Sequence, residues 1–351
     1  MKGCASFIRG VFMKKTVLWF LKAGAAALIA FVILSVFSYF YYNLPIHYSD
    51  PSGVTDYVWD RNAFCSRGTE GFSWLKTDDN GYVNTYPNKK EQVDILVMGS
   101  SHSEGFNVNY DENYTYVLNE LLEEKGKGLY AYSVATSGHG LERNINNLSA
   151  ALERFQPSKY VVIEFPDLEL DPEGLKEMVE GRLEPMPSYN SGLIFQLQKS
   201  DLLRLMYYQL SQVSINKAVE AELLEEKPDE QLYEFYYDYY MNQMLAMAAE
   251  TAREHDCELI ITYLSLLEFD YNGRLVEPMD AARREQFRGM CEKNGIVYLD
   301  MYSAYAEMYN TTNRLPRGYS NTVAGEGHTN KYGHACIARE LYQLITKEDF
   351  A

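Results

Sequence analysis

The sequence predicts an α/β protein, a three-layer α/β/α sandwich around a central parallel sheet, preceded by one N-terminal transmembrane helix. Three observations carry this prediction. An uncharged apolar stretch lies near the N-terminus, short apolar segments alternate with helical patterns from residue 93 onward, and compact polar motifs follow some of these segments. Short apolar strands that alternate with amphipathic helices are typical of a parallel sheet covered by helices on both faces.

The uncharged stretch comes first in chain order, at residues 23–43 (AGAAALIAFVILSVFSYFYYN). A helix of this length spans the ~30 Å hydrocarbon core of a membrane. Lys14, Lys15 and Lys22 precede it and aromatic residues close it, and basic flanks favour the cytoplasmic side. We therefore predict a basic cytoplasmic tail at 1–22 and a single-pass signal anchor in the cell membrane, with the rest of the chain extracytoplasmic. A cleaved signal peptide is the alternative, although the apolar run is long for one.

The remaining chain divides into a lead-in and a main domain. Residues 44–92 are irregular and are expected to form a stalk and a lead-in cover, whereas residues 93–351 carry the alternating pattern. Apolar segments predict strands at 93–98, 129–134, 160–165, 258–263 and 296–301. Amphipathic patterns predict helices at about 114–125, 141–155, 229–255, 279–294 and 332–346. Residues 168–228 interrupt the alternation and are expected to be a mostly helical insertion.

Charge and cysteine content exclude several classes of function. Residues 1–42 carry five basic residues and no acidic one, so the rest has 27 Lys and Arg against 49 Asp and Glu. Such an acidic body repels nucleic acid. The five cysteines form no CxxC pair, so we expect neither a zinc site nor another metal or cofactor, and sequence cannot choose a disulfide. The 30 tyrosines suit a sugar-binding cleft or simply a Tyr-rich surface.

Polar residues gather where the first predicted strand ends, in GSSHSEG at residues 99–105. Ser101 is a candidate nucleophile there, because parallel sheets form sites beyond the carboxyl ends of their strands. A serine hydroxyl requires a base. His328, just before the last helix, is the candidate base, and Glu326 is the acid expected to orient it. Gly138, after the second strand, is expected to provide an oxyanion-hole N–H together with that of Ser101. Each feature alone is more often a turn, a helix cap or an exposed loop residue.

Together these motifs resemble the SGNH/GDSL hydrolase superfamily. Residues 99–105 resemble its Gly-Asp-Ser-x-x-x-Gly block, the segment around Gly138 its second block, and Glu326-Gly327-His328-Thr329-Asn330 its last. Three departures stand out: Ser100 replaces the usual Asp, the acid is Glu, and the third-block Asn is missing, with Leu168 near its place. Membrane-anchored proteins of alginate and teichoic-acid acylation also lack a full third block, and the chain resembles that branch.

The resemblance implies a flavodoxin-like sheet and a Ser101–His328–Glu326 triad that acts on acyl, chiefly acetyl, esters of a cell-envelope glycan. Hydrolysis and O-acyl transfer both fit it, and a membrane-bound O-acyltransferase is an implied partner. His102, His139 and Asn330 are expected to contact substrate, with Asn330 also fixing the His328 loop. For His102, a helix-capping or solvent-facing role is the alternative. A degenerate domain that binds glycan or scaffolds an envelope assembly is the second hypothesis. A dinucleotide-binding domain is disfavoured because the first turn lacks the GxGxxG glycines.

Overall fold

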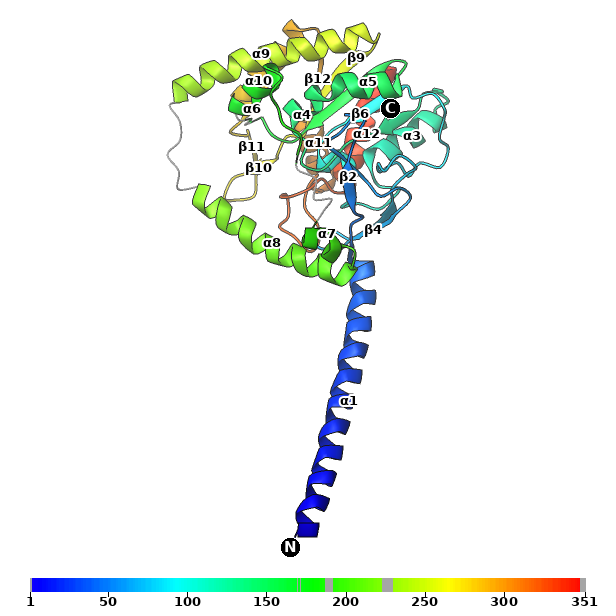
Figure 1. The fold of residues 1–351 in the computed structure, drawn as a ribbon. Helices are drawn as coiled ribbons and strands as arrows, with labels where there is room; N and C mark the ends of the chain where they lie inside the picture. The colour runs from blue at the N-terminus through cyan, green and yellow to red at the C-terminus, as the bar shows by residue number, and fades with distance from the viewer. Residues whose placement is uncertain (1, 169, 171, 187–191, 223–229, 348–351) are drawn as a thin grey trace.

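The computed structural model describes residues 2–168, 170, 172–186, 192–222 and 230–347. Its first element is the long helix α1 (Lys2–Tyr41), which projects from the body of the protein (Figure 1). The segment Lys15–Tyr41 has a mean hydropathy of 2.3 and is not buried within the protein. It is the one described helix that is long and apolar enough to cross a membrane, and it contains most of the stretch predicted at 23–43.

The core of the body is a five-stranded parallel sheet, as predicted. Its strand order is β12-β9-β8-β6-β7, so the chain builds outward in both directions from β6. The strands are β6 (Ile95–Met98), β7 (Ala131–Ser133), β8 (Tyr160–Phe165), β9 (Glu258–Tyr263) and β12 (Val297–Asp300). Two of them, β8 and β9, match the predicted bounds residue for residue.

Helices cover both faces of the sheet, which confirms the three-layer fold (Figure 1). Strand side chains alternate: Ile95 and Val97 face one helical layer, whereas Leu96 and Met98 face the other. The first layer contains α3 (Tyr114–Glu124), α11 (Tyr302–Thr312) and α12 (Lys331–Thr346). The second contains α4 (Leu141–Asn146), α5 (Leu148–Phe155), α6 (Pro172–Val179), α9 (Glu230–Glu254) and α10 (Ala281–Lys293). Helix α11 was not predicted.

The predicted insertion is helical where the structure describes it. After α6 come α7 (Gly192–Gln198) and α8 (Asp201–Glu222), while 169, 171, 187–191 and 223–229 lie outside the described residues. Helix α8 begins beside the end of α1, where the ring centroids of Tyr42 and Tyr208 are 4.5 Å apart. Figure 1 shows it running across the base of the body.

The lead-in (44–92) contains short strands where an irregular segment was expected, and it folds onto the body. It contains β2 (His47–Ser49), β3 (Tyr57–Trp59), β4 (Phe64–Arg67) and β5 (Ser73–Lys76), and β4 pairs with β1 (Tyr42–Asn43), which lies just before the lead-in. Trp59, Cys65 and Leu75 form a small core with Phe106, which follows the polar motif after β6. The lead-in is therefore next to the candidate site. A further hairpin, β10 (Glu268–Phe269) with β11 (Leu275–Val276), follows β9.

Candidate active site

Ser101 lies at the first turn after β6 and begins the short helix α2 (Ser101–Glu104). Ser100 caps this helix: its side chain accepts a hydrogen bond from the backbone N–H of His102 at 3.2 Å. Gly99 has no space for a side chain, since a Cβ there would lie 2.5 Å from Ser103 Oγ. The turn therefore brings the half-buried Ser101 to the carboxyl edge of the sheet, where the motif predicted it.

Glu164, a fully buried residue on the neighbouring strand β8, binds this turn through hydrogen bonds. Its carboxyl group accepts hydrogen bonds from the Ser100 backbone N–H at 3.0 Å and from Ser103 Oγ at 2.5 Å. The hydroxyl of Ser100 donates to it as well, at 3.0 Å. Burial raises the pKa of Glu164, and the Ser103 and Ser100 hydrogen bonds counter only part of that effect. Sequence reasoning missed this contact because a lone Glu in an apolar strand carries no motif.

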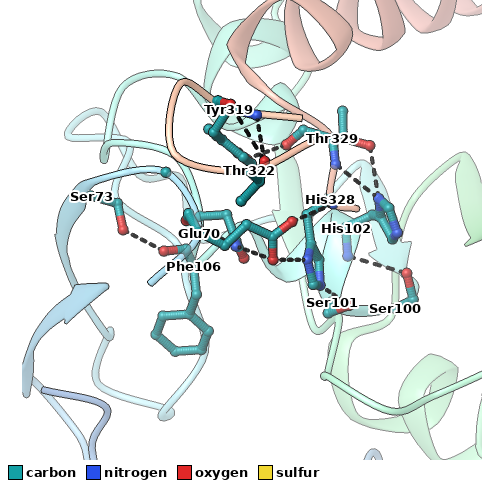
Figure 2. A network of polar contacts seen from close by, with 12 residues as sticks. Glu70, Ser73, Ser100, Ser101, His102, Phe106, Tyr319, Thr322, His328 and Thr329 are labelled. Atoms are coloured by element: carbon teal, nitrogen blue, oxygen red, sulfur yellow. Dashed lines mark hydrogen bonds and ion pairs between the residues drawn. The ribbon is translucent and has the colours of Figure 1, made fainter. Parts of the chain in front are cut away.

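The structure brings Ser101 and His328 together, although 227 residues separate them in the chain. Ser101 Oγ lies 2.8 Å from His328 Nε2, within hydrogen-bond distance (Figure 2). His328 is in the loop before α12, on the same edge of the sheet. The structure thus brings together the two residues that the sequence predicted to act as nucleophile and base, and their catalytic roles stay a prediction.

The carboxylate that contacts His328 is Glu70, from the lead-in (Figure 2). Glu70 Oε2 lies 2.6 Å from His328 Nδ1, and Oε1 accepts the backbone N–H of His328 at 2.7 Å. Burial acts to raise the pKa of Glu70, but the hydrogen bonds and charge of His328 outweigh it, so the pKa is lowered. Because the ionised Glu70 accepts a hydrogen bond from Nδ1, the single proton of a neutral His328 ring lies on Nδ1. The Nε2 atom can then accept a hydrogen bond from the Ser101 hydroxyl.

The prediction that Glu326 orients His328 is therefore wrong. Glu326 is exposed, between two glycines with positive φ, Gly325 at +85° and Gly327 at +74°. The turn they form directs residue 326 away from the protein interior. A Cβ on Gly327 would clash with Glu70 Oε1, so this glycine instead permits the approach of Glu70. The only sequence signal for Glu70 was an acidic residue beside a glycine in an irregular segment.

His102 lines a cavity of about 850 Å³ beside the Ser101–His328 pair. Its Nδ1 accepts the backbone N–H of Thr329 at 3.1 Å and lies 2.8 Å from the Thr329 hydroxyl. Burial, and secondarily the positive charge of Arg317, hold the pKa of His102 well below its usual value. A neutral ring that accepts at Nδ1 carries its proton on Nε2. The prediction that His102 contacts substrate stays open, and its side chain caps no helix.

Two other predicted substrate contacts are corrected. His139 is 2% exposed and lies against the lead-in, with Nε2 3.5 Å from Asp56. Asn330 caps α12: its Oδ1 accepts from the N–H groups of Tyr332 and Gly333. Its Nδ2 donates to the carbonyls of Leu315 and Gly318, both at 2.9 Å. Backbone partners therefore use the hydrogen-bonding capacity of Asn330, which fixes the His328 loop as was also expected.

Gly138 lies in the loop after β7, with φ of +84°. The Thr136 N–H of this loop donates to the Gly99 carbonyl at 3.0 Å, which places the loop beside the turn that carries Ser101. No described residue accepts a hydrogen bond from the Gly138 N–H. Its role as an oxyanion donor stays a prediction. Leu168, near the position of the missing third-block Asn, is 1% exposed and belongs to the core.

Glu104, at the end of α2, also contacts the loop after β7 that contains Gly138. Its fully buried carboxyl group accepts hydrogen bonds from Trp59 Nε1 at 2.5 Å and from the Ser137 N–H at 3.1 Å. Burial raises its pKa to about 7, against these hydrogen bonds. Among the described residues no cluster of three or more His, Cys, Asp or Glu is arranged to hold a metal ion.

Comparison with known proteins gives matches only among solved structures, since no family model and no curated protein matches the chain. An esterase, EstA from Pseudoalteromonas sp., is 13% identical with a TM-score of 0.38, over 72% of this chain and 96% of that one. The acetyl xylan esterase AlAXEase is 12% identical with a TM-score of 0.38, over 72% and 99%. A GDSL-like lipase from Parabacteroides merdae is 15% identical with a TM-score of 0.39, over 74% and 97%.

Two of these neighbours are esterases and one is a GDSL-like lipase, but likenesses this distant assign neither an activity nor a substrate to the chain. What the site does is therefore inferred from its own geometry.

Proposed function

We propose that the protein is a membrane-anchored serine esterase or O-acyltransferase of the SGNH/GDSL type, with Ser101, His328 and Glu70 as its triad. One observation carries the proposal: an unbroken hydrogen-bonded chain from Ser101 Oγ to His328 Nε2 at 2.8 Å and from Nδ1 to Glu70 at 2.6 Å. A nucleophile, a base and a group that orients the base, each within hydrogen-bond reach, are what acyl transfer through serine requires.

In the proposed reaction Ser101 Oγ attacks the carbonyl carbon of an ester while His328 Nε2 takes the hydroxyl proton. Glu70 stabilises the imidazolium, and the N–H groups of Ser101 and Gly138 bind the oxyanion. Collapse of the tetrahedral intermediate breaks the ester C–O bond, and His328 protonates the leaving oxygen. The acyl-Ser101 intermediate then passes its acyl group to water or to a sugar hydroxyl: His328 takes the proton of that acceptor and gives it to Ser101 Oγ as the acyl–Oγ bond breaks.

Attack on the acyl-enzyme by water and attack by a sugar hydroxyl require the same residues, so the triad is compatible with both a hydrolase and a transferase. The acidic body, the many tyrosines and the apolar N-terminal helix support an acylated, chiefly acetylated, cell-envelope glycan as substrate. In the transferase case, a membrane-bound O-acyltransferase would load the acyl group. Anchorage by α1, with the N-terminus cytoplasmic and the domain outside, is part of this proposal.

The second candidate is a glycan-binding or scaffolding domain without catalysis, favoured by the missing third-block Asn. A separation of more than about 5 Å between Ser101 Oγ and His328 Nε2 would favour it, because proton transfer needs hydrogen-bond contact. The 2.8 Å contact supports the enzyme instead.

The test is mass spectrometry of the full chain, purified in mild detergent, after reaction with a fluorophosphonate. We expect labelling at Ser101 that disappears in His328→Ala, while His255→Ala, which changes a half-buried histidine outside the triad, serves as the matched control and keeps full labelling. Circular dichroism verifies that each variant is folded. A folded wild-type protein that is not labelled at Ser101 would support the binding domain.

A further inference from the structure

The cavity beside the triad lies beyond the carboxyl ends of β8 and β9, where parallel sheets place their ligands. Its volume of about 850 Å³ is within the range of small-molecule sites. His102, the residue after Ser101, lines it, and the ring centroid of His102 is 5.0 Å from that of His328. The cavity is also lined by apolar residues, namely Leu168, Leu266 and Met279. A ligand in this cavity would therefore lie next to the reacting groups.

Arg317 lines the same cavity and is the unusual residue in it, being only 7% exposed. One Nη donates to the carbonyl of Leu264, whereas Nε has no hydrogen-bond partner among the described residues. No described carboxylate lies within ion-pair distance of the guanidinium; Glu164 and Asp167 act on it from farther away. Buried arginines are almost always paired, because an uncompensated buried charge is costly.

The acidic residues of the cavity do not supply the missing partner. Asp280 accepts from the Tyr263 hydroxyl at 2.6 Å and pairs with Arg284 at 3.2 Å. Glu268 accepts the backbone N–H of Met279 at 3.0 Å. Asp167 is exposed. Arg317 thus presents a positive charge to the cavity without a carboxylate in contact.

Arg317 is also tied to the catalytic loop through its backbone. It forms an isolated antiparallel bridge with Thr329, the residue after His328, and its carbonyl accepts the N–H of Gly325. The same Thr329 holds His102 Nδ1. Thr329, which follows His328, therefore contacts both His102 and Arg317, the two residues that line the cavity nearest the triad.

We propose that this cavity binds an anionic group, a carboxylate or a phosphate, on the molecule whose ester Ser101 attacks. Arg317 would be its counter-ion, and the Nε2–H of neutral His102 a second donor. A planar guanidinium suits both oxyanions because it donates two parallel hydrogen bonds. This inference rests on the proposed function and narrows it: the substrate is an acylated acidic molecule rather than a neutral sugar ester.

The experiment measures binding without turnover, so that it does not depend on catalysis. Isothermal titration calorimetry on the full-length Ser101→Ala protein in detergent compares sodium glucuronate, inorganic phosphate and neutral glucose. We expect glucuronate or phosphate to bind and glucose not to bind, and the tighter of the two anions identifies the group. Adding Arg317→Gln should weaken that binding at least about tenfold, the loss expected for a charged hydrogen bond.

Arg314→Gln is the matched control, since Arg314 is an exposed arginine of the same loop that does not line this cavity. We expect it to bind the anion as the parent does. Anion binding that survives Arg317→Gln, that is lost in Arg314→Gln, or that is missing from a folded parent would overturn the inference. If Arg317→Gln does not fold, Arg317→Lys is measured in its place. Weaker anion binding would support two parallel hydrogen bonds from the guanidinium, and unchanged binding would overturn the inference. Fluorophosphonate labelling of the wild type tests the triad separately.

Discussion

At the scale of single residues, the pairing of Glu70 with His328 joins two parts of the chain that are 258 residues apart. Both carboxylate oxygens are used, one on the imidazole and one on the backbone N–H of His328. The group that orients the imidazole is thereby supplied by the lead-in rather than by the sheet domain.

The pair Glu70→Gln and Glu326→Gln tests this assignment. We expect Glu70→Gln to slow labelling of Ser101 by a fluorophosphonate roughly 1,000-fold or more, because a neutral amide neither fixes the tautomer nor stabilises the imidazolium. Glu326→Gln should label at the wild-type rate, since its side chain is exposed. Stopped labelling reactions analysed by mass spectrometry give both rates. Equal slowing in the two variants would contradict the assignment.

Glu104 gives a prediction about pH. Folding raises its pKa from 4.5 to about 7, so between these values the folded state keeps a proton that the unfolded state has lost. Its contribution to stability is complete below about pH 4.5 and decreases as the pH rises to 7, by up to ~3 kcal/mol.

Urea unfolding of the full chain in detergent at pH 5, 6, 7 and 8 measures this effect. We expect Glu104→Gln to show a smaller fall in the free energy of unfolding across this range than the wild type. The exposed Glu91→Gln is the control and should follow the wild type. Parallel curves for Glu104→Gln and wild type would show that Glu104 does not keep its proton.

At the scale of elements, β8 and β9, the two six-residue strands of the central sheet, were the most predictable. They have the predicted bounds because both of their faces are covered, so most of their side chains are apolar, with Glu164 and Thr262 as buried exceptions. Helix α11 was missed because its Tyr-rich sequence shows a weak apolar stripe, and only Tyr305 and Met308 of this helix are buried. Its position depends on the sheet and α12 being present.

A prediction at this scale concerns Asn330 at the start of α12. Asn330 caps the helix and satisfies two loop carbonyls, so Asn330→Ala should lower the free energy of unfolding by about 2–3 kcal/mol. Asn330→Asp keeps the helix cap but loses the two donated hydrogen bonds, so we expect an intermediate loss. Asn310→Ala, on the exposed side of α11, is the control. Urea unfolding measures all three, and a loss below about 0.5 kcal/mol in Asn330→Ala would contradict the capping role.

At the scale of the whole molecule, aromatic residues lie where α1 joins the body. Trp74 Nε1 donates to the carbonyl of Phe40 at 3.1 Å, and the two rings are 5.8 Å apart. Phe40, Phe72 and Trp74 are exposed there, where aromatic side chains would meet a membrane interface. Helix α8 runs across the same end of the body (Figure 1).

Cys4 offers a test of the proposed orientation, because the other four cysteines are buried and free. In intact spheroplasts, a membrane-impermeant maleimide should leave the full chain unlabelled and should label Cys4 after permeabilisation. Cys4→Ser removes that signal and is the control. Labelling of Cys4 in intact spheroplasts would reverse the orientation, and an intact mass that lacks residues 1–22 together with the apolar stretch after them would show a cleaved signal peptide.

The sequence by itself determined the features that local periodicity encodes. These are the apolar N-terminal span, the parallel sheet with helices on both faces, and the places of Ser101 and His328 at strand and helix ends. Such features follow from neighbouring residues and from the rule that parallel strands end at one edge.

Only the tertiary structure decided which acid meets His328, that His139 and Asn330 are buried in structural roles, and that Arg317 lines the cavity without a carboxylate partner. Those facts depend on contacts between residues far apart in the chain. Sequence spacing favoured Glu326 because it is two residues from His328, but the turn at Gly325 and Gly327 leaves Glu326 exposed, while the folded lead-in brings in Glu70.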